Sequence, residues 1–156
     1  MHTFKDYYHN EVILSFDDEP FSKEPKHVWV ICRYEGKWLL TAHKERGLEF
    51  PGGKVEDGET AGNAALREVM EETGGAVSTL QYIGQYHVSG KSATIIKNVY
   101  YAEIEKLLEK ETYFETNGPV LLNDLPNNIP NNADYSFIMK DGVLTHCLEK
   151  ISDACK

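Results

Sequence analysis

The chain has 156 residues, of which 41% are hydrophobic and 26% charged, and its formal net charge at pH 7 is −9. This length and composition are typical of one globular domain, residues 1–156, and exclude a disordered or membrane-spanning class. The acidic balance argues against broad electrostatic binding to nucleic acid, which usually depends on a basic face.

The opening segment, MHTFKDYYHNEV, has no basic run leading into an apolar stretch. No window in the sequence approaches the about 20 apolar residues that a membrane helix needs. We therefore expect a cytoplasmic protein with no membrane partner, as a monomer or a homodimer. The three cysteines, Cys32, Cys147 and Cys155, lack a paired metal spacing such as C-x-x-C, so we expect neither zinc nor disulfides.

The first third of the chain is predicted to be mainly extended. Aromatic and β-branched residues favour strands at Glu11–Phe16, Lys26–Arg33 and Lys37–His43, and Glu35-Gly36 supplies a hairpin turn between the last two. The acidic, proline-containing segment Asp17–Pro25 is predicted to be a loop.

A sharp turn is predicted at Glu49–Gly53, because Pro51 fixes its own φ and the two glycines permit unusual backbone geometry. A helix is then predicted from Thr60 to Thr73, with Thr60 as its N-cap and Gly74 as its stop. The stripe expected to face the core consists of Gly62, Leu66, Val69 and Thr73. The small residues Ala61, Ala64 and Ala65 are expected to leave room for a ligand.

The second half of the chain favours strands at Leu80–Val88, Ala93–Ile104 and Val120–Leu122, with a polar loop over Glu105–Pro119. A turn-rich segment, Asn123–Asn132, precedes one or two helices within Tyr135–Ile151, which are broken at Asp141-Gly142. Strands interrupted by one central helix and closed by another predict an α/β fold with a mixed sheet and helices on both faces.

Three carboxylates crowd one face of the predicted central helix. Glu68, Glu71 and Glu72 stand at i, i+3 and i+4 and therefore project together. Like charges at this spacing cost roughly a few tenths of a kcal/mol each, and acids near a helix C-terminus oppose its dipole. A hard divalent cation would offset that cost, so the pattern predicts Mg²⁺, with Mn²⁺ as a substitute.

The segment from Gly53 to Gly75 resembles the Nudix box, G-x5-E-x7-R-E-U-x-E-E-x-G-U, in which U is a bulky aliphatic residue. The matched positions are Gly53, Glu59, Arg67, Glu68, Val69, Glu71, Glu72 and Gly74. The one departure is Gly75, where the motif has an aliphatic residue, and Val77 is expected to fill that packing role. Eight matched positions over 23 residues are far more specific than a single glycine motif.

The resemblance continues outside the box. LEFPGGK at Leu48–Lys54 looks like the entry to the box in MutT-like proteins, and KHVWVICR, GKWLLT and SFIMKDG resemble the bacterial YtkD subgroup of MutT-like nucleoside triphosphatases. The implied fold is the Nudix fold, an α/β/α sandwich around a mixed sheet. The implied activity is hydrolysis of (deoxy)nucleoside triphosphates, purine nucleotides and 8-oxo-dGTP among them, to nucleoside monophosphate and pyrophosphate.

By this resemblance, Glu68, Glu71 and Glu72 bind Mg²⁺ together with the carbonyl of Gly52, and Arg67 orients the glutamates. The alternative is a solvated acidic helix face on which Arg67 pairs with Glu71.

Two further charged residues have roles by resemblance. Glu59 supports the metal site, or is simply an acid that the helix dipole favours. Lys54 approaches phosphate, or is a surface cation.

The attacking water must lose a proton, and a carboxylate near the metal is a suitable acceptor. Glu115 lies in YFETNGPVLL, which resembles the placement of a distal metal-binding or base glutamate in MutT-like proteins. Glu68 is the competing base, so the predicted catalytic residues are Glu68, Glu72, Arg67 and Glu115, with Glu115 also a candidate metal ligand.

For the nucleobase the sequence offers aromatic rings that can stack and amides that can read a base edge. The candidates are Tyr34, His43, Phe50, Tyr86, Asn131, Asn132 and Phe137. MutT-like proteins have an arginine shortly before LEFPGGK, and the different residues here, Ala42–Arg46, leave selectivity for an oxidised guanine unassigned.

Two alternatives remain open. The same site would serve an RNA 5′-pyrophosphohydrolase, because the scissile anhydride is the same, although the net charge weighs against a long RNA partner. A Nudix-fold nucleotide-binding domain without catalysis is less favoured, since such domains usually lose box carboxylates and this chain retains all of them.

Overall fold

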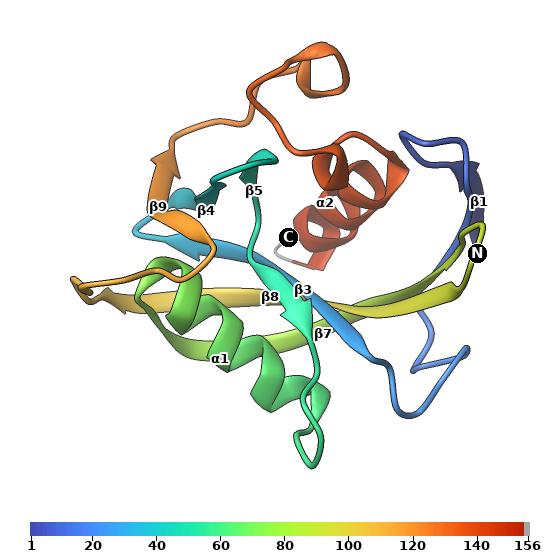
Figure 1. The fold of residues 1–156 in the computed structure, drawn as a ribbon, viewed down its shortest axis with the longest axis horizontal. Coiled ribbons are helices and arrows are strands. Elements are labelled where there is room, and N and C mark those ends of the chain that lie inside the picture. Colours follow the sequence, from blue (N-terminus) through green and yellow to red (C-terminus); the bar gives the residue numbers. More distant parts are fainter. Residues whose placement is uncertain (155–156) are drawn as a thin grey trace.

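The computed structural model describes residues 1–154, and a mixed sheet forms its centre (Figure 1). The strands are β1 (His2–Lys5), β2 (Glu11–Ser15), β3 (His27–Tyr34), β4 (Lys37–His43), β5 (Gly47–Glu49), β6 (Gly52–Lys54), β7 (Gly75–Ser89), β8 (Thr94–Leu107) and β9 (Thr116–Leu122). Their order is β1-β2-β7-β8-β3-β4-β5, with β6 paired to β3 and β9 to β4. β3 and β8 run parallel, whereas the other pairs are antiparallel.

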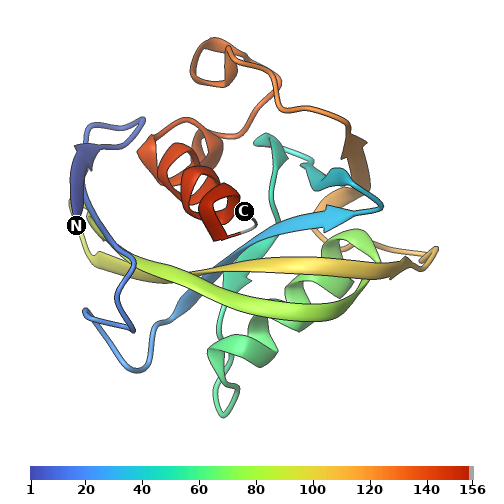
Figure 2. The ribbon, with the colours of Figure 1, turned by 180° about the vertical axis from the view of Figure 1, so that it is seen from behind.

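Helices cover both faces of this sheet. α1 (Ala61–Thr73) and α2 (Gly142–Ala154) lie on opposite sides, and the short 3₁₀ helices η1 (Ile129–Asn131) and η2 (Phe137–Met139) precede α2 (Figures 1 and 2). Successive side chains of a strand point to opposite faces. In β3, Val28 and Val30 accordingly join the cluster beneath α1, whereas Trp29 and Ile31 join the cluster beneath α2. The predicted α/β class with helices on both faces is confirmed.

The caps of α1 agree with the prediction. The Thr60 side chain accepts a hydrogen bond from the Asn63 N–H at 3.1 Å, and Gly74 ends the helix in the left-handed region, at φ 75°. A Cβ at Gly74 would lie 2.1 Å from the Leu108 carbonyl oxygen, so glycine is required there for space as well as for φ.

The predicted core stripe of α1 is wrong in part. Val69 and Thr73 are buried, but Leu66 is 40% exposed and Gly62 is half-buried. Ala64 and Ala65 are fully buried against the sheet instead, with Ala61 packed beside them, so the expected ligand space does not exist at Ala64 and Ala65. Small side chains are suited to such close packing of a helix on a sheet.

Several strand boundaries also differ from the prediction. β1, β5 and β6 were not predicted, and β7 begins at Gly75. The loop between β8 and β9 is shorter than predicted, residues 108–115, because β8 continues to Leu107 and β9 begins at Thr116. Gly75 is packed tightly, since a Cβ there would lie 3.1 Å from Val69 Cγ1, and Val77 packs against the same cluster.

The C-terminal break falls where it was predicted. Asp141 precedes α2, and its Oδ1 accepts a hydrogen bond from the Val143 N–H at 2.9 Å. Cys32 and Cys147 are buried free thiols, whereas Cys155 lies outside the described residues. In residues 1–154 the structure contains no helix with the length and apolar character needed to cross a membrane.

Candidate functional site

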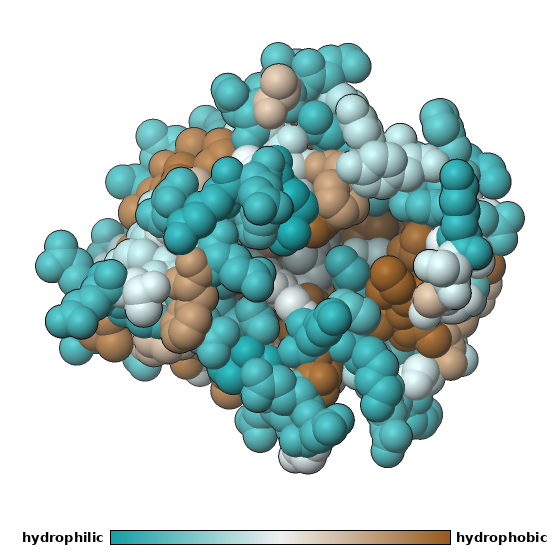
Figure 3. All heavy atoms as spheres, viewed as in Figure 1, coloured by the Kyte–Doolittle hydropathy of each residue, from teal (hydrophilic) through white to brown (hydrophobic). Residues whose placement is uncertain are grey.

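A cleft of about 710 Å³ lies where α1, β6 and the loop before β9 meet the face of the sheet on the α2 side. Its walls come from α1, β3, β5, β6, β8, the 108–115 loop and η2. Hydrophilic side chains surround a hollow near the middle of the face in Figure 3, where some hydrophobic surface is visible. The cleft therefore combines segments that are far apart in the sequence.

The structure brings the predicted acidic residues together at one end of this cleft. Glu68, Glu71 and Glu72 line it from α1, and Glu115 lines it from the loop before β9. Gly52 lines it from β6. These residues, with Arg67, form what we call the carboxylate end.

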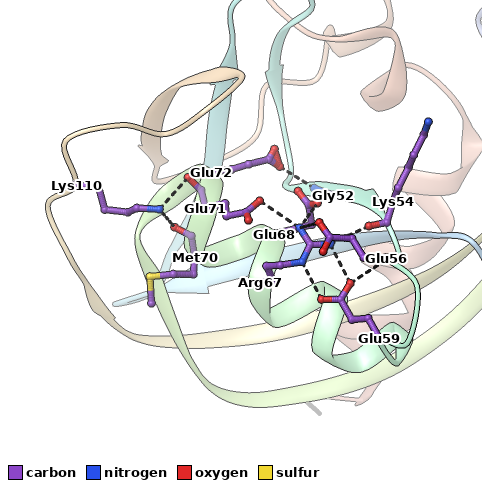
Figure 4. Close-up of polar contacts among 10 residues, drawn as sticks. All are labelled: Gly52, Lys54, Glu56, Glu59, Arg67, Glu68, Met70, Glu71, Glu72 and Lys110. Atoms are coloured by element: carbon purple, nitrogen blue, oxygen red, sulfur yellow. Dashed lines mark hydrogen bonds and ion pairs between the residues drawn. The ribbon is translucent and has the colours of Figure 1, made fainter.

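Arg67 is the centre of the hydrogen bonding at this end (Figure 4). Its guanidinium binds both carboxylate oxygens of Glu59, at 2.8 and 3.0 Å, and donates from Nη1 to Glu68 at 2.9 Å and Glu71 at 3.2 Å. Nη2 also donates to the Lys54 carbonyl at 2.9 Å. The Arg67 hydrogen bonds lower the pKa of Glu59 to about 2. These hydrogen bonds exclude the alternative in which Arg67 is an exposed residue paired only with Glu71.

Burial disfavours the charged forms of two of the clustered carboxylates. Burial raises the pKa of Glu72 to about 8, although the Gly52 N–H, 3.0 Å from its Oε1, acts in the opposite direction. Burial also raises the pKa of Glu68 to about 7 against the effect of Arg67, and the charges of Glu71 and Glu115 add to the rise. A bound cation would relieve both shifts.

The glycine pair lets β6 approach the carboxylates. A Cβ at Gly53 would lie 2.6 Å from the Glu68 carboxylate, and one at Gly52 would lie 2.5 Å from the Val28 carbonyl oxygen. Gly52 faces Trp29 in the antiparallel pair, and its N–H points away from β3 to Glu72. The carbonyl of a strand residue points to the same side as its N–H, so the Gly52 oxygen is directed away from β3 as well.

The donor set at this end suits a hard divalent ion. Carboxylate and carbonyl oxygens are the ligands that Mg²⁺ and Mn²⁺ prefer. Within residues 1–154, no three acidic, histidine or cysteine side chains already converge as a ligand set. Arg67 holds Glu68 and Glu71, but burial still disfavours the charged forms of Glu68 and Glu72, and a bound cation would favour them.

The C-terminal end of α1 is closed by groups from other elements. Lys110 Nζ donates to the carbonyls of Met70 at 3.0 Å and Glu71 at 3.3 Å (Figure 4), and the hydroxyls of Thr41 and Thr116 donate to that of Glu72. α1 has no basic residue in its own last turn, so Lys110 supplies the cation that the helix dipole favours. It also anchors the loop that carries Glu115.

Six of the predicted substrate-binding residues lie outside the cleft lining. His43 is buried, and its Nδ1 accepts hydrogen bonds from the Glu45 and Arg46 N–H groups. The Phe50 ring is fully buried, with Trp29 and Trp38 in edge contact, so neither face is free to stack on a base.

The asparagines Asn131 and Asn132 belong to η1 and the turn after it, where the Asn132 side chain accepts a hydrogen bond from the Asp134 N–H at 2.9 Å. Tyr86 is a core residue, and Tyr34 ends β3 beside the turn to β4. Lys54 and Phe137 do line the cleft.

Besides Glu56 in the turn after β6, sequence reasoning missed four polar residues that line the cleft. Arg46 binds Glu49 through two hydrogen bonds, at 2.9 and 3.1 Å, and Glu49 is 2% exposed. His27 and Lys97 lie on β3 and β8. No local motif marks these residues, because strand register and tertiary packing place them.

Residues 21–117 match one family model, described as the NUDIX domain. The chain is 61% identical over 154 residues to "Putative 8-oxo-dGTP diphosphatase YtkD" of Bacillus subtilis (strain 168), covering 99% of this chain and 98% of that protein. Among solved structures, an E68A mutant of the Bacillus subtilis pyrophosphohydrolase BsRppH has a TM-score of 0.98 at 60% identity, covering 99% and 98% of the two chains. A NUDIX hydrolase from Nitrosomonas europaea, with a TM-score of 0.66 at 20% identity over 84% and 90%, shares the fold.

Proposed function

This chain belongs to the Nudix family of pyrophosphohydrolases, and from that premise we propose that it hydrolyses nucleoside triphosphates to nucleoside monophosphate and pyrophosphate with Mg²⁺ bound. Purine nucleotides, including 8-oxo-dGTP, are the proposed substrates, and the cytoplasm is the proposed location. The observation that carries the proposal is that four carboxylates, Glu68, Glu71, Glu72 and Glu115, line one cleft together with Gly52, and burial disfavours the charged forms of two of them without a bound cation. The 61% identical relative named for 8-oxo-dGTP supports that nucleotide as the first to test.

In this proposal the carboxylate end holds the metal through Glu68, Glu71, Glu72, Glu115 and the Gly52 carbonyl. When bound, the divalent ion neutralises the phosphates and stabilises the leaving pyrophosphate. Arg67 fixes Glu68 and Glu71 through its hydrogen bonds, and the Gly52 N–H fixes Glu72. Arg67 is a positioning residue, because its donors are occupied by protein acceptors.

The proposed chemical step is an attack by water on an anhydride phosphorus. A new P–O bond forms, the bridging P–O bond breaks, and the water proton passes to a carboxylate. Glu115, exposed on the loop, and Glu68, half-buried on α1, are the proposed acceptors because both line the cleft. Burial raises the pKa of Glu68 to about 7 in the metal-free protein, and a bound cation would lower it again, so the base is identified by kinetics of the metal-bound enzyme. The pH–rate profiles of Glu68→Gln and Glu115→Gln identify the base. The base is the residue whose replacement abolishes the fall in rate at low pH.

The test is hydrolysis of a panel of triphosphates with Mg²⁺ and analysis of the products. Equimolar monophosphate and pyrophosphate support the proposal. Release of orthophosphate, or inactivity across the panel, contradicts it.

A second candidate substrate is the triphosphorylated 5′ end of RNA. The cleft continues past the carboxylates to Ile95, Phe137 and Ile138, which offers apolar surface beyond the scissile group. The similarity to a protein named a pyrophosphohydrolase is compatible with either substrate. Comparing kcat/KM for triphosphorylated RNA and free triphosphate decides between the two.

A further inference from the structure

Three basic side chains form a row across the floor of the cleft, outside the carboxylate end. His27 on β3 is the direct register partner of Lys54 on β6 and of Lys97 on β8. Directly paired residues project from the same face of a sheet. That face is the α2 side, because Trp29 and Val99, each two residues farther along its strand, join the core beneath α2. All three basic residues line the cleft.

The row is separate from the hydrogen-bonded network around Arg67. The Lys54 side chain points away from the glutamates, although its backbone carbonyl accepts a hydrogen bond from Arg67 (Figure 4). Exposure falls along the row, from Lys54, which is exposed, to His27 and Lys97, which are half-buried. The row therefore extends from the open edge of the cleft toward its interior.

The protein does not neutralise this row by direct contact. In the described part of the chain, neither Lys54 nor Lys97 forms a salt bridge, and neither Nζ has a hydrogen-bond partner. Lys97 Nζ lies 5.8 Å from the centroid of the Tyr86 ring. The cleft arginines, by contrast, are both paired with glutamates.

His27 lies between the two lysines in this row. Its Nδ1 is buried and has no hydrogen-bond partner among residues 1–154, and such atoms are rare in folded proteins. Burial, followed by the charges of Lys97 and Lys54, lowers the pKa of His27. An anion held between the lysines would reverse the electrostatic part of that shift.

We propose that Lys54, His27 and Lys97 form a phosphate subsite on the α2 side of the cleft, distinct from the metal-binding carboxylate end. This inference rests on the proposed function, because it assigns a second anchor for the same substrate. The phosphate has two sources: the polyphosphate chain of a free triphosphate, or the phosphodiester that joins the first two nucleotides of a triphosphorylated oligonucleotide. In both cases the row contributes to substrate binding, and therefore to KM, whereas the carboxylate end contributes to the chemical step, and therefore to kcat.

The test compares Lys97→Met, which keeps length and removes charge, with Lys106→Met, a control at an exposed lysine on the same strand outside the cleft. KM and kcat are measured for GTP and for a triphosphorylated dinucleotide. Lys97→Met is expected to raise KM by about tenfold or more, the loss typical of one hydrogen bond to a charged group, and to leave kcat within about threefold. Lys97→Arg should recover much of the loss.

A higher KM for both substrates assigns the row to the polyphosphate chain, and a higher KM for the dinucleotide alone assigns it to the phosphodiester. Unchanged KM values for both, or an equal effect of Lys106→Met, would overturn the proposal. If Lys97→Met does not fold, Lys54→Met at the exposed end of the row replaces it, with the same expected result.

If the wild-type protein hydrolyses no triphosphate, the proposed function fails but the row can still be tested. Inorganic tripolyphosphate is then titrated calorimetrically without metal. Weaker binding to Lys97→Met than to Lys106→Met supports the subsite, and equal binding overturns it.

Discussion

The two ends of the cleft differ in how their charged side chains are hydrogen-bonded within the protein, although burial still disfavours the charged forms of Glu68 and Glu72 at the carboxylate end. At the carboxylate end, Arg67 donates five hydrogen bonds and Glu72 is fixed by a backbone N–H. At the other end, which contains the row of basic residues, the Nζ atoms of Lys54 and Lys97 have no hydrogen-bond partners within residues 1–154. The first end is preorganised, whereas the second depends on a ligand for completion. Changes at the first should therefore alter kcat, and changes at the second should alter KM.

The largest effect is expected for Glu72→Gln. The glutamine oxygen can still accept the Gly52 hydrogen bond, but the anionic ligand is lost. We expect kcat to fall by about a thousandfold or more, with the fold intact by circular dichroism. Glu105→Gln, at an exposed position on β8, is the matched control. Near-wild-type turnover in Glu72→Gln would remove Glu72 from the site.

Arg67→Met tests the preorganisation itself. Loss of the five hydrogen bonds should displace Glu68 and Glu71 and lower kcat by about a hundredfold, because small misplacements at a reacting centre are costly. KM should change little, since Arg67 does not contact substrate in this proposal. Arg33→Met, which removes an arginine stacked on Trp38, is the control. A large rise in KM with unchanged kcat would show that Arg67 binds substrate instead.

The metal-free protein should lose stability as pH rises from about 4.5 to about 8. Burial raises the pKa of Glu72 to about 8 in the folded state, so the folded protein holds this proton more tightly than the unfolded chain. The stabilisation is complete below the ordinary glutamate pKa and is lost as pH rises through the folded value, by up to about 5 kcal/mol.

Chemical denaturation at several pH values, without divalent metal, measures this slope. Glu72→Gln should flatten it, and added Mg²⁺ should stabilise the wild type more at pH 8 than at pH 6. If Glu72→Gln loses stability with rising pH as steeply as the wild type, Glu72 is not the group responsible for the pH dependence.

The smallest effect is expected for Lys110→Met. Loss of the ammonium at the end of α1 should reduce the free energy of unfolding by about 1 kcal/mol and lower kcat by about threefold, as the loop carrying Glu115 loosens. Lys110→Arg should restore both values and Lys106→Met should affect neither, as assayed by urea unfolding and steady-state kinetics. If kcat stays at the wild-type value while stability falls, Lys110 does not position the site.

The contrast between the two ends also separates what the sequence could and could not predict. The caps of α1 and its acidic face are local features, since Thr60, Gly74 and the glutamates act within a few residues of one another. The core stripe failed because it favoured Leu66 over the alanines, although small residues are what a helix packed closely on a sheet accommodates. β6 was not predicted because Gly52 and Gly53 are poor strand formers. This strand forms through its pairing with β3.

The basic row was beyond prediction for a physical reason. His27 and Lys97 are 70 positions apart and become neighbours through the parallel register of β3 and β8. Residue type was a poor guide to the substrate site as well. His43 and Phe50 are residue types that can bind a nucleotide. In this structure, however, His43 accepts hydrogen bonds within a turn and the Phe50 ring is packed in the core.

The central claim is that the carboxylate end cuts a nucleoside triphosphate into monophosphate and pyrophosphate. Its most direct test is product analysis by ion-exchange chromatography for purine triphosphates, with Mg²⁺ and with chelator, on wild-type and Glu72→Gln protein in parallel. We predict equimolar monophosphate and pyrophosphate from the wild type with Mg²⁺, and neither product with chelator or from the variant. Orthophosphate as the product, or equal turnover by Glu72→Gln, would contradict the claim.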